Sequence, residues 1–396
     1  MPDKPIYLDN NSTTRVDPRV VEKMLPFFTE DYGNASSVTH EYGIAASNAV
    51  TRARKQVADL LQCDPKCLIF TSGATEANNL AIFGVMRAST HRGRHLIVNA
   101  AEHKAVLDPA ARLRDEGYEV TVLPVDPLGA VRIEDLNVAI RDDTVLVSVM
   151  HANNEVGTLN AIERIARVCK RAGVLLHTDA SQSVGKLRFD VNELGVDLLS
   201  LSGHKLYGPK GVGALFIRPG FPKNQIAPLV EGGGHERKLR SGTLPVHQII
   251  GFGEACEICD ANLEAETGRI ATLRELLKNM LSERVADLHF NGNAAFQLPG
   301  TLHLSIPGAN AEAIMMKLRH KLAISSGSAC TTTSPEPSHV LKAMGIPTSL
   351  LSCCLRIGIG RFTTEDEIRS AAELLSDAIR TTRELSGYKV SQKIGT

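Results

Sequence analysis

Residues 196–213, VDLLSLSGHKLYGPKGVG, decide how the fold of this chain is interpreted. The first half, VDLLSLSG, is apolar and then small, which predicts a short buried strand. The strand ends at Ser202, and His204 and Lys205 follow, so three polar groups stand at the edge where open α/β sheets bind ligands. A tight, rigid turn is predicted next from Gly208, Pro209, Gly211 and Gly213. Taken alone, the stretch also fits a surface turn with solvated lysines.

Four segments before this stretch share its pattern of an apolar run followed by polar residues, and helical segments separate them. They are HLIVNAAEH, YEVTVLPVD, TVLVSVMHANNEVG and VLLHTDASQSVG, at residues 95–103, 118–126, 144–157 and 174–185. The alternation predicts an α/β fold with a mostly parallel sheet. Polar residues near the strand ends, where ligands sit in such sheets, are His103, Asn153, Asn154, Asp179 and Gln182.

A glycine turn at Gly73 predicts a second place for an anion. Residues 66–85, KCLIFTSGATEANNLAIFGV, have the pattern of a strand, a turn and a helix. Ala74 and Thr75 would open that helix, so backbone N–H groups and the Thr75 hydroxyl would point at a phosphate. No GxGxxG motif with a suitable downstream acid follows any of the strands, which counts against a nicotinamide cofactor.

The chain is expected to form two domains. A helix near 247–263 would end a large domain, 16–263, and a second helix would begin near Glu266. Residues 1–15 and 264–396 would form a smaller α+β domain, in which the polar segment after PIYLD lines a site. The loop Ser328–Ser338, SACTTTSPEPS, is rich in small residues, threonine and proline, so we expect it to be exposed and mobile.

Composition excludes several classes of protein. Lys plus Arg equals Asp plus Glu at 44 each, so nothing in the net charge favours nucleic acid or an anionic membrane. We find no apolar run of signal-peptide or membrane-span length and expect a soluble, cytoplasmic protein. The eight cysteines lack the density of a disulfide framework. Cys256 and Cys259 form a CxxC inside a helical pattern, and we expect buried helix cysteines and no metal site.

Together these residues suit pyridoxal 5'-phosphate. Lys205 is the amine that would hold its aldehyde as a Schiff base, and Asp179 is the anion that would keep its ring nitrogen protonated. His103 would stack on the ring. The other groups follow by role: Gln182 and Asn154 would reach the ring oxygen, and Ser202, His204 and Thr75 would hold the phosphate.

The chain resembles the cysteine desulfurases of the NifS/IscS type from end to end. The matching motifs are YLDNNSTT, YGNASS, TSGATEANN, AEHKAV, HANNEVG, HTDASQSVGK, SGHKLYGPKGVG, GGGHERKLRSGT, SSGSAC and LRIGIGRFTTEDEI. The resemblance implies the type I fold of pyridoxal-phosphate-dependent transferases, adds Ala74 to the phosphate ligands, and implies a homodimer in which Thr243 reaches the partner's phosphate. The chain departs from the family at Ser12 and Ala35, where alanine and proline are usual.

Cys330 distinguishes this chemistry from that of other pyridoxal enzymes. A thiol on a small-residue loop can move onto a substrate, although the loop alone also fits an unreactive exposed thiol. The resemblance implies that L-cysteine becomes L-alanine, that Lys205 or His103 takes the α-proton, and that Cys330 keeps the sulfur as a persulfide. Arg356 is the natural partner of the substrate carboxylate, with Asn154 assisting, or else it forms an ion pair between domains.

Several alternatives remain open on the sequence. A selenocysteine lyase or a related aminotransferase would need the same cofactor residues. A third possible function is that of a non-catalytic scaffold for sulfur-acceptor proteins. The sulfur acceptor is also open. An iron–sulfur scaffold, a tRNA-thiolation relay, a nitrogenase pathway or a DNA-modification system would each take a persulfide.

Overall fold

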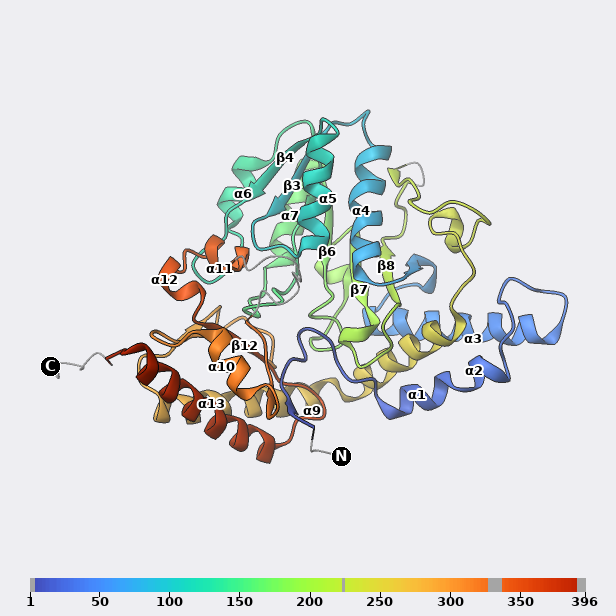
Figure 1. The fold of residues 1–396 in the computed structure, drawn as a ribbon. Coiled ribbons are helices and arrows are strands. Elements are labelled where there is room, and N and C mark those ends of the chain that lie inside the picture. The colour runs from blue at the N-terminus through green and yellow to red at the C-terminus, as the bar shows by residue number, and fades with distance from the viewer. Residues whose placement is uncertain (1–3, 223–224, 327–336, 390–396) are drawn as a thin grey trace.

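A seven-stranded mixed sheet forms the centre of the computed structural model, which describes residues 4–222, 225–326 and 337–389 (Figure 1). The strand order is β2-β8-β7-β6-β5-β3-β4, and only β8 runs antiparallel to its neighbours. The strands are β2 (Leu68–Thr71), β3 (His95–Asn99), β4 (Glu119–Leu123), β5 (Thr144–Ser148), β6 (Leu175–Asp179), β7 (Leu198–Ser202) and β8 (Gly213–Ile217). The predicted mostly parallel sheet is confirmed.

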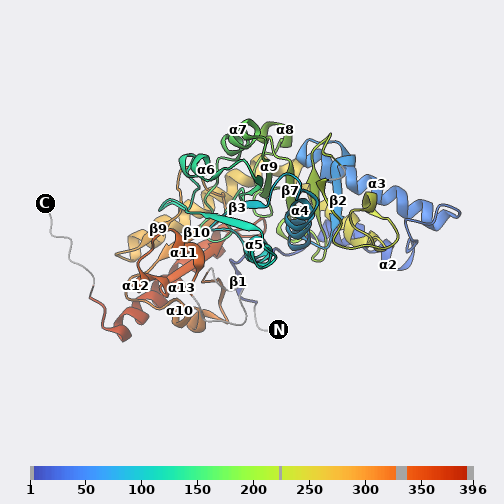
Figure 2. The same cartoon turned by 90° about the horizontal axis from the view of Figure 1, so that it is seen from above.

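Helices cover both faces of this sheet, as the view from above shows (Figure 2). Apolar side chains of α4 (Ala74–Ala88) and α5 (Lys104–Asp115) pack on one face. A larger cluster on the other face includes α3 (Glu41–Leu61), α7 (Ile162–Ala172) and the first half of α9 (Val246–Arg284). The shorter helices are α1 (Pro18–Met24), α2 (Pro26–Thr29), α6 (Ile133–Ala139) and α8 (Val191–Leu194). The sheet is therefore buried on both sides, as parallel strands require.

Helix α9 differs from the prediction of two helices that meet near residues 263–266. It runs unbroken for 39 residues. The segment DANLEAE contains no glycine or proline, and alanine, leucine and glutamate are good helix formers, so nothing in it ends a helix. The first half of α9 packs in the core under the large sheet and the second half in a separate apolar cluster.

That second cluster lies under a small antiparallel sheet of order β12-β10-β9, formed by β9 (His289–Asn291), β10 (Thr301–Ser305) and β12 (Cys354–Gly358). Helices α10 (Ala311–Leu318) and α13 (Glu365–Ser386) pack on it. The pair β1 (Ile6–Tyr7) and β11 (Leu322–Ala323) brings the N-terminal arm to this part of the chain. The two cores agree with the predicted small α+β unit, while the domain boundary at residue 263 stays a prediction.

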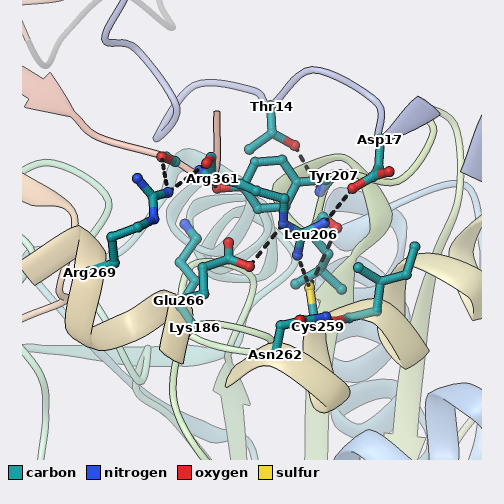
Figure 3. A network of polar contacts seen from close by, with 12 residues as sticks. Thr14, Asp17, Lys186, Leu206, Tyr207, Cys259, Asn262, Glu266, Arg269 and Arg361 are labelled. Carbon is teal, nitrogen blue, oxygen red and sulfur yellow. Dashed lines mark hydrogen bonds and ion pairs between the residues drawn. The ribbon is translucent and has the colours of Figure 1, made fainter. Parts of the chain in front are cut away.

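Arg361 joins the elements between the two cores (Figure 3). Its guanidinium lies 2.9 Å from Glu266 Oε2 on α9 and 2.9 Å from Asp17 Oδ2, the N-cap of α1, and stacks 4.1 Å from the ring centroid of Tyr207. Since these charges are largely buried and mutually paired, we expect the junction to be rigid.

The end of the predicted mobile loop is more ordered than expected. Ser338 is buried and caps α11 (His339–Ala343), which is followed by α12 (Thr348–Leu351). Its hydroxyl donates to Glu155 Oε2 at 2.6 Å. The expectation of an exposed loop is therefore wrong at Ser338, because a buried carboxylate supplies its hydrogen-bond partner; residues 327–336 lie outside the described residues. No helix in the described ranges is long and apolar enough to cross a membrane.

Candidate active site

A cavity of about 460 Å³ opens at the carboxyl ends of the central strands. It collects the predicted site residues from six separate stretches of the chain: Ala74, Thr75, His103, Asn154, Asp179, Gln182, Ser202, His204, Lys205 and Arg356. Two predicted residues are not part of it. Thr243 is exposed and does not line this cavity, and Cys330 lies outside the described residues.

Lys205 ends a short 3-10 turn, Gly203–Lys205, directly after β7. Its Nζ donates to the backbone carbonyl oxygens of Asn11 and Ser12, at 2.5 and 2.7 Å. The N-terminal arm thus closes one side of the cavity, as its polar sequence suggested. Gly213, at the end of the same motif, starts β8 so close to Gly73 that an added Cβ would lie 2.8 Å from the Gly73 Cα, which explains why a glycine is needed there.

Asp179 is the last residue of β6, and its carboxylate is held on both oxygens. Asn78 Nδ2 donates to Oδ2 at 2.7 Å, while the backbone N–H and hydroxyl of Ser181 donate to Oδ1 at 2.9 and 2.5 Å. Sequence reasoning missed Asn78 and Ser181. In the sequence, only the position of Asn78 pointed to the site, because this residue lies one turn into the helix that the glycine turn opens. Three donors therefore keep this carboxylate in place.

His103 caps α5, and its Nδ1 accepts the backbone N–H of Ala105 at 3.1 Å. Burial lowers the pKa of His103, and the nearby charge of Lys205 lowers it further, against the opposing effect of Asp179. The ring is therefore neutral at pH 7 and carries its proton on Nε2, because an acceptor nitrogen has none. Burial likewise lowers the pKa of His204 to about 4, with the positive charges of Lys205 and Lys210 adding to the effect.

The turn at Gly73 is shaped to receive an anion. Gly73 has φ +150°, and α4 begins at Ala74, so the first N–H groups of a 15-residue helix face the cavity. The hydroxyl of Ser202 lies across from it, 3.9 Å from where a Gly73 Cβ would stand. The site thus combines a helix N-terminus with two hydroxyl side chains, those of Thr75 and Ser202.

Arg356 lies in β12 and is the largest fully buried side chain among the described residues. Its Nη2 contacts Asp9 Oδ1 at 3.0 Å and Ser12 Oγ at 2.6 Å, and its Nη1 donates to the carbonyl oxygen of Asn154 at 3.1 Å. Asp9 and Arg356 both fall in the predicted small domain, so this ion pair is not the pair between domains that was considered as the alternative role. Nε of Arg356 and Oδ1 of Asn154 are buried without a hydrogen-bond partner among the described residues, and both residues line the cavity.

The cysteines outside this site match their expected role. Cys256 and Cys259 are buried on α9, and Cys354 is buried in β12 next to Cys353. Burial raises the pKa of Cys259 to about 11, so its thiol keeps its proton. In the part of the chain that the structure describes, no group of three or more histidine, cysteine and acidic residues has the arrangement of a metal site.

Known proteins resemble this chain over nearly its whole length. The model of the family Aminotransferase class-V matches residues 6–370. The curated cysteine desulfurase IscS of Pectobacterium carotovorum is 48% identical over 384 residues, which cover 96% of this chain and 94% of that protein. A solved structure titled NifS-like protein has a TM-score of 0.89 at 37% identity and covers 96% of this chain and 100% of that one. One titled SspA in complex with cysteine has a TM-score of 0.80 at 34% identity, over 91% of this chain and 100% of that one.

Proposed function

Because the chain belongs to the aminotransferase class-V family, we propose that it is a cysteine desulfurase that uses pyridoxal 5'-phosphate. It takes the sulfur of L-cysteine, releases L-alanine and passes the sulfur from Cys330 to acceptor proteins. The observation that carries this proposal is the 48% identity to a curated cysteine desulfurase over 96% of the chain. The cavity alone would also suit other reactions of the same cofactor.

The residues of the cavity fit that cofactor. Asp179 offers a fixed carboxylate for a ring nitrogen, Lys205 an amine for an aldehyde, and the start of α4 a set of N–H groups for a phosphate. The unpartnered Oδ1 of Asn154 gives a further polar group toward the ligand. When bound, the cofactor supplies an electron sink for the carbon that loses its proton.

Of the two candidate bases, Lys205 and not His103 takes the α-proton of the substrate. In its neutral form His103 has its hydrogen on Nε2 and uses Nδ1 to accept from Ala105, so it can donate a hydrogen bond but has no free lone pair to take a proton. Lys205, once free as an amine, is then the base for the α-proton of the substrate. Arg356 holds the substrate carboxylate through its guanidinium, and Asn154 assists.

Cys330 carries the step that defines the enzyme. Its thiolate attacks the sulfur of the substrate, an S–S bond forms, and the Cβ–S bond breaks with its electron pair left on carbon. That carbon takes a proton and becomes the methyl group of L-alanine. In balance, an enzyme thiol and L-cysteine give an enzyme persulfide and L-alanine, and the persulfide sulfur is what an acceptor protein receives, for example in iron–sulfur cluster assembly.

A homodimer with Thr243 at the second subunit's phosphate site is part of this proposal. Exposed apolar side chains gather in residues 25–42, namely Leu25, Phe28, Tyr32, Val38 and Tyr42. The glycine-rich loop that leads to Thr243 adjoins them, since His235 Nε2 lies 3.1 Å from Ser36 Oγ. Light scattering should give twice the chain mass, and Val38→Glu with Tyr42→Glu should reduce it; a monomeric wild type would contradict the dimer.

The test of the activity measures products from L-cysteine. The wild type should release equal amounts of L-alanine and sulfur in the presence of a thiol reductant. Cys330→Ala should bind the cofactor, seen as visible absorbance, and stop sulfur release, while Lys205→Ala should lose the covalently bound band. An unchanged turnover of Cys330→Ala would contradict the proposed role of this thiol.

Two other functions predict different products. An aminotransferase would form an oxo acid and no L-alanine from cysteine, and a selenocysteine lyase would process selenocysteine far faster than cysteine. A non-catalytic scaffold would show no product and no cofactor band.

A further inference from the structure

Gln182 has a fixed orientation in the cavity because its two ends meet groups of opposite kind. Its Nε2 donates to the carbonyl oxygen of Asn11 at 2.9 Å, and its Oε1 accepts from Nζ of Lys186 at 3.3 Å. A carbonyl oxygen only accepts, so Nε2 must face Asn11, and this orientation leaves Oε1 to accept from the amine of Lys186. One of the two Nε2 hydrogens serves Asn11 and the other is left for a ligand.

Lys186 occupies an unusual place for a lysine. Figure 3 shows it beside Glu266, below the network of Arg361. The Glu266 carboxylate pairs with Arg361 Nε at 2.9 Å, and none of the ion pairs formed within the described residues includes Lys186. Its side chain borders a cavity of about 20 Å³, which also contacts Asn11 and has room for about one water molecule. Lys186 is partly buried, and Gln182 is the one side chain to which its amine donates a hydrogen bond within the described residues.

The charges around Lys186 are of mixed sign. Burial, together with the positive charges of Lys205 and Arg356, lowers the pKa of the Lys186 ammonium to about 7. Cys259 and Glu266, both on α9, act in the opposite direction. Because Lys186 forms no ion pair within the described residues, its hydrogen bond to Gln182 is the contact that points to a role at the cavity.

We propose that Lys186 is a positioning residue of the active site. By donating to Oε1 of Gln182, it holds the NH2 group of that amide toward the cavity, where the free N–H donates to the ring oxygen of the cofactor. The inference rests on the proposed function, because it needs the pyridoxal ring in this cavity. The same hydrogen bond polarises the amide, so Lys186 acts on the electronic state of the cofactor without touching it.

The test is a pH titration of the visible absorption band of the enzyme with its cofactor bound. A donor to the ring oxygen stabilises its negative charge and makes the neighbouring bound nitrogen less basic. Lys186→Met should therefore move the midpoint of the titration to higher pH by roughly one unit, the size expected for one hydrogen bond to a charged oxygen. Gln182→Ala should move it in the same direction, and Lys170→Met, an exposed lysine of α7, should not move it.

The double variant Lys186→Met with Gln182→Ala shows whether the effect passes through Gln182. The midpoint should then shift no further than in the larger of the single variants, because both remove one interaction. Additive shifts, or an unchanged midpoint in Lys186→Met, would overturn the inference. If Lys186→Met unfolds, Lys186→Gln, which keeps a donor of similar reach, should show a smaller shift. An enzyme without any cofactor band would instead contradict the proposed function itself.

Discussion

The hydroxyl of Ser12 lies 2.6 Å from Nη2 of Arg356, and the same nitrogen lies 3.0 Å from Asp9 Oδ1. The resemblance noted above leads us to expect alanine at this position, and an alanine could not form this hydrogen bond. The N-terminal arm thereby orients the guanidinium from 344 residues away before a substrate arrives. Arg356 lines the cavity, and its Nε has no hydrogen-bond partner in the part of the chain that the structure describes.

Ser12→Ala should raise the KM for L-cysteine and leave kcat nearly unchanged. The hydroxyl accepts from Arg356 and keeps its own hydrogen for the substrate carboxylate, so its loss weakens binding before and during the reaction equally. One neutral hydrogen bond of about 1 kcal/mol corresponds to a roughly fivefold rise in KM. Steady-state kinetics with L-cysteine measures the change, and an unaltered KM would show that Ser12 does not help to bind substrate.

Asp9→Asn should destabilise the fold by about 2 kcal/mol, because it leaves the buried guanidinium of Arg356 without its counter-charge. The side chains of this pair are 1% and 20% exposed, so water screens the interaction poorly. Urea unfolding measures the loss. Asp377→Asn is the matched control, since its ion pair with Arg380 is exposed and should be worth less than about 0.5 kcal/mol. Equal effects of the two substitutions would contradict the prediction.

His177 should make the protein sensitive to acid. Its ring is buried between the hydroxyls of Ser148 and Ser200, and burial lowers its pKa from 6.5 to about 4. Between these values the unfolded chain binds a proton that the folded chain does not. The contribution of His177 to stability is therefore complete above pH 6.5 and falls by about 1.4 kcal/mol per pH unit as the pH drops toward 4.

His177→Gln tests this, because glutamine does not titrate in this range. The variant should be less stable than the wild type at pH 7, and the difference in unfolding free energy should narrow at pH 5. Exposed His320 offers a control, His320→Gln. If the difference in unfolding free energy is the same at pH 7 and pH 5, His177 is not the source of the acid sensitivity.

Glu102→Gln should stabilise the protein, and more so at higher pH. The carboxyl is fully buried, and burial raises its pKa well above the usual value although the N–H of Met150 donates to Oε1 at 2.6 Å. The folded chain keeps this proton at pH values where the unfolded chain has lost it, so the wild type loses stability as the pH rises above 4.5. Glutamine removes that dependence. Thermal unfolding at pH 6 and pH 8 measures it, and a variant less stable than the wild type at pH 8 would refute the prediction.

Much of the fold was predictable because its signals are local. The apolar runs that lead to His103, Asp179 and Ser202 contain the strands β3, β6 and β7. The exception is the long helix α9. The prediction of two helices placed a break where a domain boundary was expected. A helix, however, ends only at a cap or at a helix-breaking residue. Residues 260–266 contain neither glycine nor proline.

The sequence by itself determined which chemistry-bearing residues follow the strands, and therefore which side chains reach one edge of the sheet. It also determined the family, through motifs spread along the whole chain. Only the tertiary structure decided how these groups are held: Lys205 on the carbonyl oxygens of Asn11 and Ser12, Arg356 on Asp9, and Gln182 on Lys186. The first two of these contacts join residues far apart in the chain, and even the short-range contact of Lys186 depends on burial by α9. Pairing and desolvation of this kind leave no local pattern, so they become visible only when the chain is folded.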